Sequence, residues 1–376
     1  MNPVRSLHID IEGGWGGSSR SLFELLSRLD RRRVLPVVAH RVDGPITQRY
    51  AEIGIPTVHV PEIFSYAPRK HKSFKNLVFK LPELILLPKA ARKIGDIAHM
   101  HKTEVIHLNY EGLFLLARLL SKQLNLPIVG HSRTQIPNNF WGRWEVFSLA
   151  KTVSHMFFIS PVEQQAFIRH AATPSEIMWN IAKIPTAPPD YPEYPVVVYL
   201  GNIDYEKGTD RLIDIAISLE KISAPPLKIN VYGVSRNKSK YFADLERRVK
   251  DNHLEHRITF EGHTSNPESV LSSALALIRT SRWNDPWGRD VIEATSLGVP
   301  VLATGSFEGV VENRKTGFLY DKFEADDFAR TLVHLIEDRS LWEQLSTAAL
   351  EKGQSQFLGE TQSLLMEKRL ESLARR

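Results

Sequence analysis

The sequence predicts an α/β protein built from two doubly wound, Rossmann-like domains. Short apolar segments alternate with helical patterns along the chain, as in parallel sheets with helical crossovers. The alternation stops at residues 184–195, where five prolines fall within twelve residues, and then restarts. Proline has a fixed φ and no backbone N–H, so this stretch predicts a hinge. We therefore expect domains at 1–183 and 196–355, followed by a helical segment at 356–376.

The first domain opens with a β–turn–α–β pattern, the opening unit of a doubly wound parallel sheet. An apolar strand at 6–11 precedes the glycine-rich turn 13–17. Ser18 and Ser19 are placed to cap the helix that follows, because their hydroxyls can accept from its first N–H groups. The later strands expected in this domain are 34–39, 57–60, 104–108, 126–130 and 155–159.

The second domain repeats the alternation of strands and helices. Its clearest helical pattern covers residues 325–338. The strands expected here are 196–200, 228–232, 257–260, 274–278, 300–303 and 317–320.

Composition narrows the class of protein. Hydrophobic residues make up 42% and charged residues 24%, which is typical of a globular chain. There is no run of 18 apolar residues, and the N-terminus lacks the apolar core of a secretory signal. Cysteine is absent, which excludes a disulfide framework, a thiolate metal site and a thiol nucleophile. We expect a cytoplasmic protein.

Positive charge is concentrated in one segment. The net charge is +5, and residues 68–102 hold nine Lys or Arg against Glu83 and Asp96. Within this segment, 75–80 and 84–87 interleave cations with large apolar side chains, as an amphipathic surface element does. An anionic partner (a membrane surface, a nucleic acid or a phosphorylated substrate) and a solvated helix face both fit this pattern.

The most informative stretch is 281–301. Asp285 and Glu293 lie eight positions apart, and Gly288 opens the helix that contains Glu293. Backbone N–H groups at such a helix start favour an anion, and a carboxylate facing a cleft accepts hydrogen bonds from hydroxyls. Taken alone, the pair is equally compatible with two exposed carboxylates around a loop.

The complete string changes this balance, because it resembles the E-x7-E segment of the retaining family 4 glycosyltransferases (glycosyl transferases group 1). Asp285 and Trp287 stand where the family has Glu and Phe. The resemblance implies that Glu293 binds the nucleotide ribose and that Asp285 lies near the donor sugar. The positions that match are Gly288, Glu293, Gly298, Pro300 and Val301.

A second stretch, 200–213, resembles the family's Gly-Arg-Leu-x-x-x-Lys-Gly turn. In the family the Arg and the Lys hold the donor diphosphate, so Lys207 inherits a phosphate contact. Asn202 stands in place of the Arg. Arg282 and Arg289 are the nearest cations in the motif that can replace it.

Residues 305–319 resemble the family's third donor motif. Gly309 occupies the usual Glu position, with Glu308 beside it. The resemblance places Ser306, Phe307 and Glu308 near the donor.

The N-terminal half offers weaker matches. Gly14, Gly16 and Gly17 belong to a loop that resembles the glycine loop beside the donor phosphate, whereas dinucleotide-binding G-x-G-x-x-G spacing is not met. His131 follows the strand 126–130 and resembles the family residue that faces the donor sugar. A structural histidine is the alternative, and His107 is a lesser candidate.

The resemblance implies a GT-B fold, in which two Rossmann-like domains face each other across a cleft. It also implies that a last helix, 360–374, crosses back to the N-terminal domain. Its expected packing stripe is Leu364, Leu365, Leu370 and Leu373.

The implied activity is retaining transfer of a hexosyl or N-acetylhexosaminyl group, without a metal or other cofactor. The donor expected is a UDP- or GDP-sugar, and the acceptor a glycan or a lipid-linked molecule of bacterial surface polysaccharide synthesis. Residues 68–102 would hold the protein peripherally on the inner membrane face; nucleic acid is not expected, since no recognised module surrounds them. One alternative is a sugar-nucleotide epimerase. The other is a non-catalytic nucleotide-sugar or glycan-binding protein, which Asn202 in place of the family Arg favours.

Overall fold

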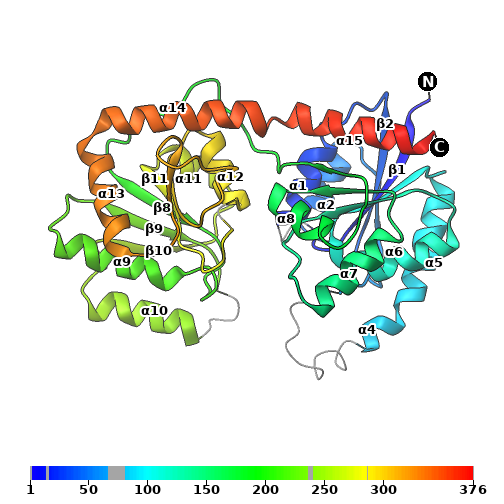
Figure 1. Cartoon of the computed structure of the whole chain (residues 1–376), viewed down its shortest axis with the longest axis horizontal. Coiled ribbons are helices and arrows are strands. Elements are labelled where there is room, and N and C mark those ends of the chain that lie inside the picture. Colours follow the sequence, from blue (N-terminus) through cyan, green and yellow to red (C-terminus); the bar gives the residue numbers. More distant parts are fainter. Residues whose placement is uncertain (1, 14–16, 67–80, 236–239, 286, 376) are drawn as a thin grey trace. The chain divides into compact units, whose positions relative to one another are not determined.

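The computed structural model divides into two compact units (Figure 1). Unit 1 comprises Met1–Ile181 and Gly359–Arg376, and unit 2 comprises Ala182–Leu358. The structure describes residues 2–13, 17–66, 81–235, 240–285 and 287–375, without the side chains of residues 81 and 82. No helix in these ranges is long and apolar enough to cross a membrane.

Unit 1 contains a parallel sheet in the order β3-β2-β1-β4-β5-β6-β7. The strand order reverses between β1 and β4, which makes their carboxyl ends the topological switch point where such sheets bind ligands. The central strands β1 and β4 are buried over almost their whole length, with polar side chains such as His8 and His107 among the buried residues. The strands are β1 (Val4–Asp10), β2 (Val34–His40), β3 (Thr57–His59), β4 (Val105–Leu108), β5 (Ile128–Ser132), β6 (His155–Phe158) and β7 (Ser175–Ile177).

The helices of unit 1 cover both faces of this sheet (Figure 1). Pro82 falls in α4 and Pro88 in α5, so no single helix contains both prolines. The described helices are α1 (Gly17–Leu26), α2 (Pro45–Glu52), α4 (Leu81–Ile85), α5 (Leu87–Met100), η2 (Glu111–Leu113), α6 (Phe114–Gln123), α7 (Phe140–Ala150), α8 (Pro161–Ile168) and α15 (Gly359–Ala374).

Near its two ends, unit 1 differs from the sequence prediction at the first helix and at the last strand of its sheet. Ser18 and Ser19 do not cap α1, because the helix already begins at Gly17. Their hydroxyls instead donate to acidic side chains, that of Ser18 to Glu12 (2.7 Å) and that of Ser19 to Asp10 (2.5 Å). The strand β7 was not expected, since Ser175–Ile177 has no apolar run.

Unit 2 contains a second parallel sheet, in the order β10-β9-β8-β11-β12-β13. Its switch point lies between β8 and β11. Each of its strands overlaps a strand predicted from the sequence. The strands are β8 (Val196–Leu200), β9 (Lys228–Tyr232), β10 (Ile258–Gly262), β11 (Ala276–Arg279), β12 (Val301–Thr304) and β13 (Gly317–Tyr320); the described helices are α9 (Thr209–Lys221), α10 (Lys240–Asp251), α11 (Pro267–Ser272), α12 (Arg289–Ser296), α13 (Ala325–Glu337) and α14 (Arg339–Gln356).

The proline-rich segment 184–195 is fastened to unit 2. The hydroxyl of Tyr191 donates to the carbonyls of Leu335 (3.3 Å) and Ile336 (3.1 Å) near the end of α13. Its ring packs edge-on against Trp342, with ring centroids 5.3 Å apart. Four residues separate Tyr191 from the start of β8, so this contact fixes the path of the segment on unit 2.

The helix α15 packs on unit 1 against α1, β1, β2 and β4. Of the leucines expected to face the core, Leu370 and Leu373 are buried and Leu365 is partly buried, but Leu364 is 41% exposed. Met366 is buried in place of Leu364, because 366, 370 and 373 share one helix face.

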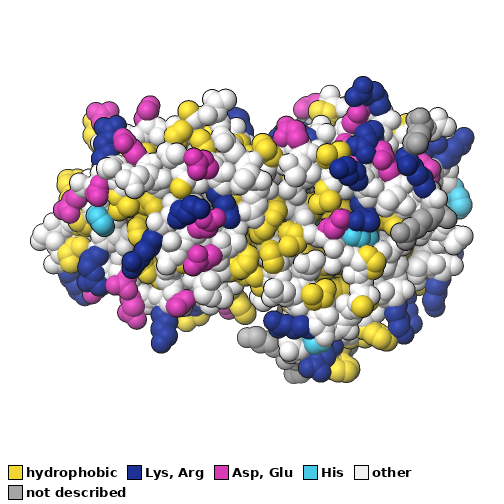
Figure 2. Space-filling view, turned by 45° about the horizontal axis from the view of Figure 1, so that its top comes forward, with side chains coloured by type: hydrophobic (Ala, Val, Ile, Leu, Met, Phe, Trp, Pro, Cys, Tyr) yellow, Lys and Arg dark blue, Asp and Glu magenta, His cyan; other side chains and the backbone are white. Residues whose placement is uncertain are grey.

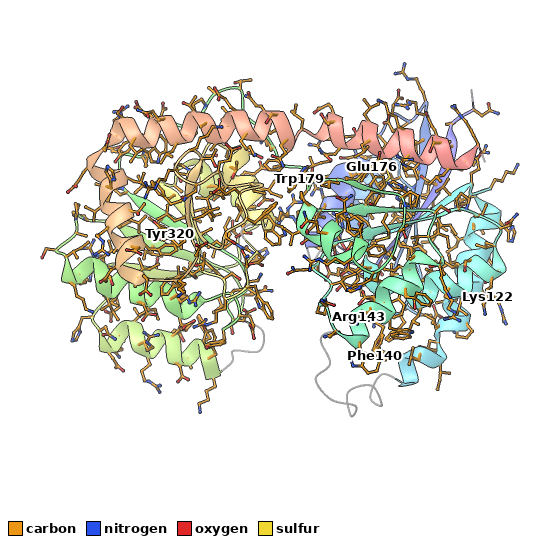
Figure 3. The ribbon with its side chains drawn as sticks, in the orientation of Figure 1. Lys122, Phe140, Arg143, Glu176, Trp179 and Tyr320 are labelled. Atoms are coloured by element: carbon orange, nitrogen blue, oxygen red, sulfur yellow. The ribbon has the colours of Figure 1, made fainter. Side chains whose placement is uncertain are left out.

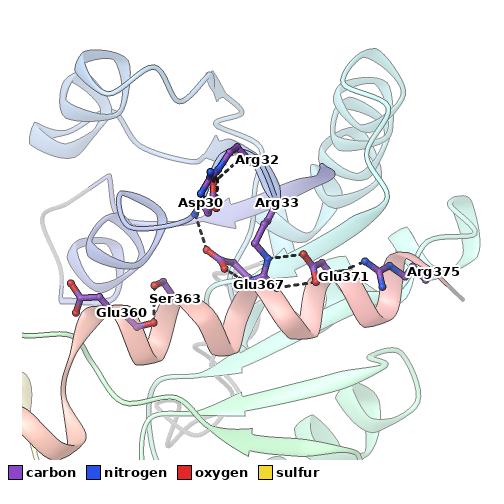
Figure 4. A network of polar contacts seen from close by, with 8 residues as sticks. All are labelled: Asp30, Arg32, Arg33, Glu360, Ser363, Glu367, Glu371 and Arg375. Carbon is purple, nitrogen blue, oxygen red and sulfur yellow. Dashed lines mark hydrogen bonds and ion pairs between the residues drawn. The ribbon is translucent and has the colours of Figure 1, made fainter. Parts of the chain in front are cut away.

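Ion pairs and hydrogen bonds reinforce the packing of α15 (Figure 4). Arg33 pairs with Glu367 (2.5 Å) and, through two nitrogens, with Glu371 (2.8 and 2.9 Å). Glu367 also accepts from the backbone N–H of Asp30 (2.7 Å). At another part of the helix, Arg369 pairs with Glu176, which Figure 3 labels (2.7 Å).

We expect Arg33→Ala to lower the free energy of unfolding of unit 1 by about 2 kcal/mol, because it leaves the buried Glu367 without its cation. The matched control is Arg32→Ala, whose guanidinium pairs with Asp30 on the surface and is 90% exposed. Urea unfolding of both variants checks this. Equal loss of stability in the two variants would contradict the importance of the contact to α15.

Candidate functional site

The loop after β8 and the end of β11 meet at the carboxyl edge of the sheet in unit 2. Gly208 has φ +71°, and a Cβ there would lie 2.0 Å from the carbonyl oxygen of Thr280. Only glycine permits this backbone conformation at this distance. The close approach brings Lys207 beside the loop that contains Asp285.

Asp285 lies between two cations. Its Oδ2 is 3.2 Å from Nζ of Lys207 and 2.7 Å from Nη2 of Arg279. Burial alone would raise the pKa of Asp285, but the charges of Arg279 and Lys207 outweigh burial and lower this pKa below its usual value. Asp285 is therefore an ionised acceptor at neutral pH.

Arg279 connects the end of β11 to the start of α12. Besides Asp285, its guanidinium pairs with Asp290 through two contacts of 2.6 and 2.8 Å, and its Nε donates to the backbone carbonyl of Asp285 (3.0 Å). A Cβ on Gly288 would lie 2.4 Å from Nη1 of Arg279, so glycine leaves room for the guanidinium. The two carboxylates overcome the effect of burial and raise the pKa of Arg279.

Sequence reasoning missed Arg279, although it directly follows the apolar segment 274–278. A charged side chain at the carboxyl end of a buried parallel strand is the signal that was available. Burying it is costly unless carboxylates compensate.

Glu293 is buried in α12, where the structure pairs it with Arg289 one turn earlier (Nε to Oε1, 2.7 Å). Arg282 is held elsewhere: two nitrogens donate to Asp210 (2.8 and 2.7 Å), and its guanidinium stacks 3.6 Å from the ring centroid of Tyr205. Both arginines expected to replace the missing cation thus contact carboxylates.

The other predicted donor residues lie on neighbouring loops. Asn202 is exposed in the loop after β8. After β12, Phe307 packs edge-on against Trp287 (5.0 Å between centroids), and Glu308 is exposed. The side chain of Asn284 holds Ser306 through two hydrogen bonds (3.2 and 3.1 Å), which joins the loops after β11 and β12.

We expect Arg279→Met to lower the free energy of unfolding of unit 2 by about 3 kcal/mol, since it leaves Asp285 and Asp290 without their shared cation. The free energy of unfolding of Arg279→Lys should lie between those of Arg279→Met and the wild type, because a single ammonium does not span both carboxylates. Urea unfolding measures both. The control is Arg330→Ala, which removes an exposed pair with Asp327 on α13; an equal effect of Arg279→Met and this control would contradict the proposed role.

In unit 1, a polar network lies at the carboxyl ends of β1, β4 and β5. Asn109 donates to Asp10 (2.9 Å) and accepts from Nη2 of Arg133 (2.6 Å), whose Nη1 donates to Asn180 (3.0 Å). The backbone N–H of Arg133 donates to Glu111 (2.8 Å). Arg133, in the string around His131, is a cation at the switch point that sequence reasoning did not select.

The structure places His131 inside the core of unit 1. The strand β5 continues to Ser132, two residues beyond its expected end, so His131 lies within the strand and is 1% exposed. Its ring is 5.6 Å from that of His107, and Nδ1 of His107 is 3.0 Å from Nδ1 of His8. Burial, together with the nearby Arg133 and His107, keeps the pKa of His131 well below its usual value.

These three buried imidazoles predict an acid-sensitive fold. Burial also lowers the pKa of His8 to about 3 and that of His107 well below its usual value. In the unfolded chain they bind protons below pH 6.5, so acid favours unfolding. Each imidazole that stays neutral in the fold therefore lowers the free energy of unfolding by about 1.4 kcal/mol for every pH unit below 6.5.

We therefore expect the free energy of unfolding in urea to fall between pH 7.5 and pH 5.5. His131→Gln should reduce this dependence, whereas the exposed His263→Gln should leave it unchanged. Equal pH dependence in the two variants would show that the buried imidazoles do not cause the loss.

The glycine loop is only partly visible. Gly14 and Gly16 lie outside the described residues, and Gly17 begins α1. Among the described side chains, no group of three or more His, Asp or Glu is placed to hold a metal ion. An open pocket of about 620 Å³ lies beside the proline-rich segment, lined partly by Val196, the first residue of β8, and by Leu297, which precedes β12. It is therefore at the amino edge of the sheet, opposite Lys207 and Asp285.

With this geometry in place, the comparisons with known proteins can be stated. Residues 180–352 match the family Glycosyl transferases group 1. The matched range includes Lys207, Arg279, Asp285 and Glu293.

Two relatives cover different shares of the chain. Poly(ribitol-phosphate) alpha-N-acetylglucosaminyltransferase of Staphylococcus aureus is 26% identical over 46% of this chain, and the alignment spans 34% of that enzyme. The chain thus spans about a third of this relative's length. The lipopolysaccharide core biosynthesis glycosyltransferase LpsE of Rhizobium meliloti is 23% identical over 80% of this chain and 82% of its own length.

Among solved structures, HepE of Anabaena in complex with UDP and glucose superposes with a TM-score of 0.79. The match covers 98% of this chain and 100% of that one, at 20% identity. It confirms the predicted fold class of two Rossmann-like, parallel-sheet domains of the GT-B type.

Proposed function

We propose that this protein is a retaining glycosyltransferase that uses a nucleotide-diphosphate sugar. The observation that carries the proposal is the Lys207–Asp285–Arg279 contact at the carboxyl edge of unit 2, within the range that matches the transferase family. This edge is where open parallel sheets bind nucleotides. The named relatives act in glycan synthesis, which supports a role in building bacterial surface polysaccharide.

In this proposal, Lys207 neutralises the donor diphosphate. The bond between the anomeric carbon and the diphosphate oxygen breaks, a bond to the acceptor oxygen forms, and the acceptor proton passes to the departing phosphate. Charge therefore accumulates on the leaving group, where a preplaced cation lowers the barrier. Arg279 continues to neutralise Asp285 when Lys207 turns to the phosphate, so the exchange leaves no carboxylate unpaired.

Glu293 is assigned to the nucleotide ribose, and Asp285 to the edge of the sugar. Arg282 and Arg289 are the candidates for a second phosphate contact, and each pairs with a carboxylate, Arg282 with Asp210 and Arg289 with Glu293. Phe307, Glu308 and Gly288 complete the site of unit 2, and Gly14, Gly16, Gly17 and His131 of unit 1 keep the roles toward the donor that the family resemblance implies. Because the ring of His131 is buried, it can contact the donor only in a conformation that exposes it.

The donor we propose is a UDP-sugar that carries a hexosyl or N-acetylhexosaminyl group. The related Anabaena structure holds UDP and glucose, and the staphylococcal relative is named for N-acetylglucosaminyl transfer. Transfer without a metal is part of the proposal, since Lys207 supplies the positive charge. Activity that survives EDTA would support it, and activity that requires added Mg²⁺ would overturn it.

A cytoplasmic location, peripheral on the inner membrane face, also remains a proposal. Residues 67–80 of the basic segment lie outside the described residues. In the rest, Ile85 (76% exposed) and Leu86 (42% exposed) stand beside the exposed Lys89. Acidic and basic side chains alternate over the face of the molecule seen in Figure 2. The membrane proposal therefore rests on the exposed side chains of Ile85, Leu86 and Lys89.

The second candidate is a non-catalytic nucleotide-sugar-binding protein. Asn202 in place of a cation favours it, because fewer charges then stabilise the leaving group. Slow hydrolysis of the donor in water, a common side reaction of transferases, separates the two candidates: a binding protein leaves UDP-sugars intact.

The test is calorimetric titration with UDP, UDP-glucose, UDP-N-acetylglucosamine and GDP. We expect UDP to bind more tightly than GDP, and Lys207→Ala and Glu293→Ala each to weaken UDP binding by about tenfold to a hundredfold, through lost charge-assisted hydrogen bonds. Lys315→Ala, which removes an exposed Lys on the loop before β13, is the matched control. Failure of UDP to bind at millimolar concentration would contradict the proposal.

A further inference from the structure

The helix α7 (Phe140–Ala150) exposes aromatic side chains and buries its acidic one. Three of its four aromatic residues, Phe140, Trp141 and Phe147, are 74%, 38% and 54% exposed, whereas Trp144 is partly buried against the core. The acidic side chain of the same helix, Glu145, is buried. Large exposed rings of this kind are retained on a surface when something else covers them.

The exposed residues form one stripe. Phe140, Arg143, Phe147 and Lys151 follow one another at intervals of three, four and four residues, which places them on a single helix face. Figure 3 labels Phe140 and Arg143 on this helix. The ammonium of Lys151 lies 4.1 Å from the centroid of the Phe147 ring. Rings and cations therefore alternate along the stripe.

We propose that this α7 stripe docks on the anionic lipid surface of a membrane. Aromatic rings are favoured at the level of the lipid headgroups, and Lys and Arg side chains there reach phosphates while their stems remain in apolar surroundings. The absence of an exposed carboxylate on α7 makes the charge of the stripe complementary to acidic lipids. The inference goes beyond the proposed transfer reaction and does not depend on the site in unit 2.

The size of the stripe favours a lipid surface over a protein partner. A stable protein interface buries about 800 Å² on each partner, whereas three partly exposed rings, each of about 150–250 Å² in full, offer much less. A lipid surface needs no matching shape, so a single short stripe is enough for reversible attachment.

The test is co-sedimentation of the full chain with vesicles of phosphatidylcholine alone or with 30% phosphatidylglycerol, in 0.1 M NaCl. We expect binding to the anionic vesicles that weakens in 0.5 M NaCl. The double variant Phe140→Ser/Phe147→Ser should bind at least tenfold more weakly. Arg143→Gln/Lys151→Gln should lose about tenfold or more on anionic vesicles and be less sensitive to salt.

Two matched controls assign the effect to α7. Tyr194→Ser removes an aromatic ring that is also 74% exposed but lies in unit 2, and it should bind as the wild type does. Ile85→Ser removes the exposed apolar side chain of α4 in the basic segment. Loss of binding in Ile85→Ser but not in the α7 variants would overturn the proposal, as would a wild-type protein that does not bind anionic vesicles.

Two further readouts keep the outcomes apart. Circular dichroism and UDP titration show that the variants are folded. Vesicle binding without UDP binding would leave this inference standing while the proposed function fails. Size-exclusion chromatography of the wild type and the Phe140→Ser/Phe147→Ser variant tests whether a second copy of the chain covers the stripe instead. A dimeric wild type and a monomeric variant would show that the stripe is a protein interface and would overturn the proposal.

Discussion

The contact between Arg279 and its two carboxylates is the constraint on which the site in unit 2 depends. Arg279 ends β11, Asp285 lies in the loop that follows, and Asp290 lies in the first turn of α12, so one guanidinium connects the strand, the loop and the helix. Gly288 leaves the space for it, and Gly208 brings Lys207 to the same carboxylate. Because each charge in this group is compensated within the fold, the side chains of Lys207, Arg279 and Asp285 are held together before any ligand arrives. Preorganised charge of this kind stabilises a leaving group without reorganisation at the moment of reaction.

Much of the fold could be predicted from the sequence, because strands buried on both faces appear as short apolar runs. The six strands of unit 2 and all but β7 of unit 1 were found this way. The edge strand β7 lacks the pattern, since Ser175–Ile177 is only partly buried. Leu364 shows the limit for helices: several apolar residues fit a stripe, and only packing decides which face is inside.

The site was harder to predict, because ion pairing and strand length are properties of the folded chain. The motif located Lys207, Asp285 and Glu293, whose positions the structure gives, but it did not show that Arg279 holds Asp285. A strand two residues longer than expected put His131 in the core. The stripe on α7 was equally hidden, since exposed aromatic residues have the same sequence pattern as a buried helix face.

The helix α15 has a consequence for how the protein is made. It completes unit 1, yet it follows the whole of unit 2 along the chain. The sheet of unit 1 therefore lacks the helix that packs with Leu22, Leu26 and Val34 until the segment of unit 2 has been synthesised. The N-terminal unit cannot complete its core first. Until α15 emerges, the apolar surface it will cover is open to chaperones and to other nascent chains.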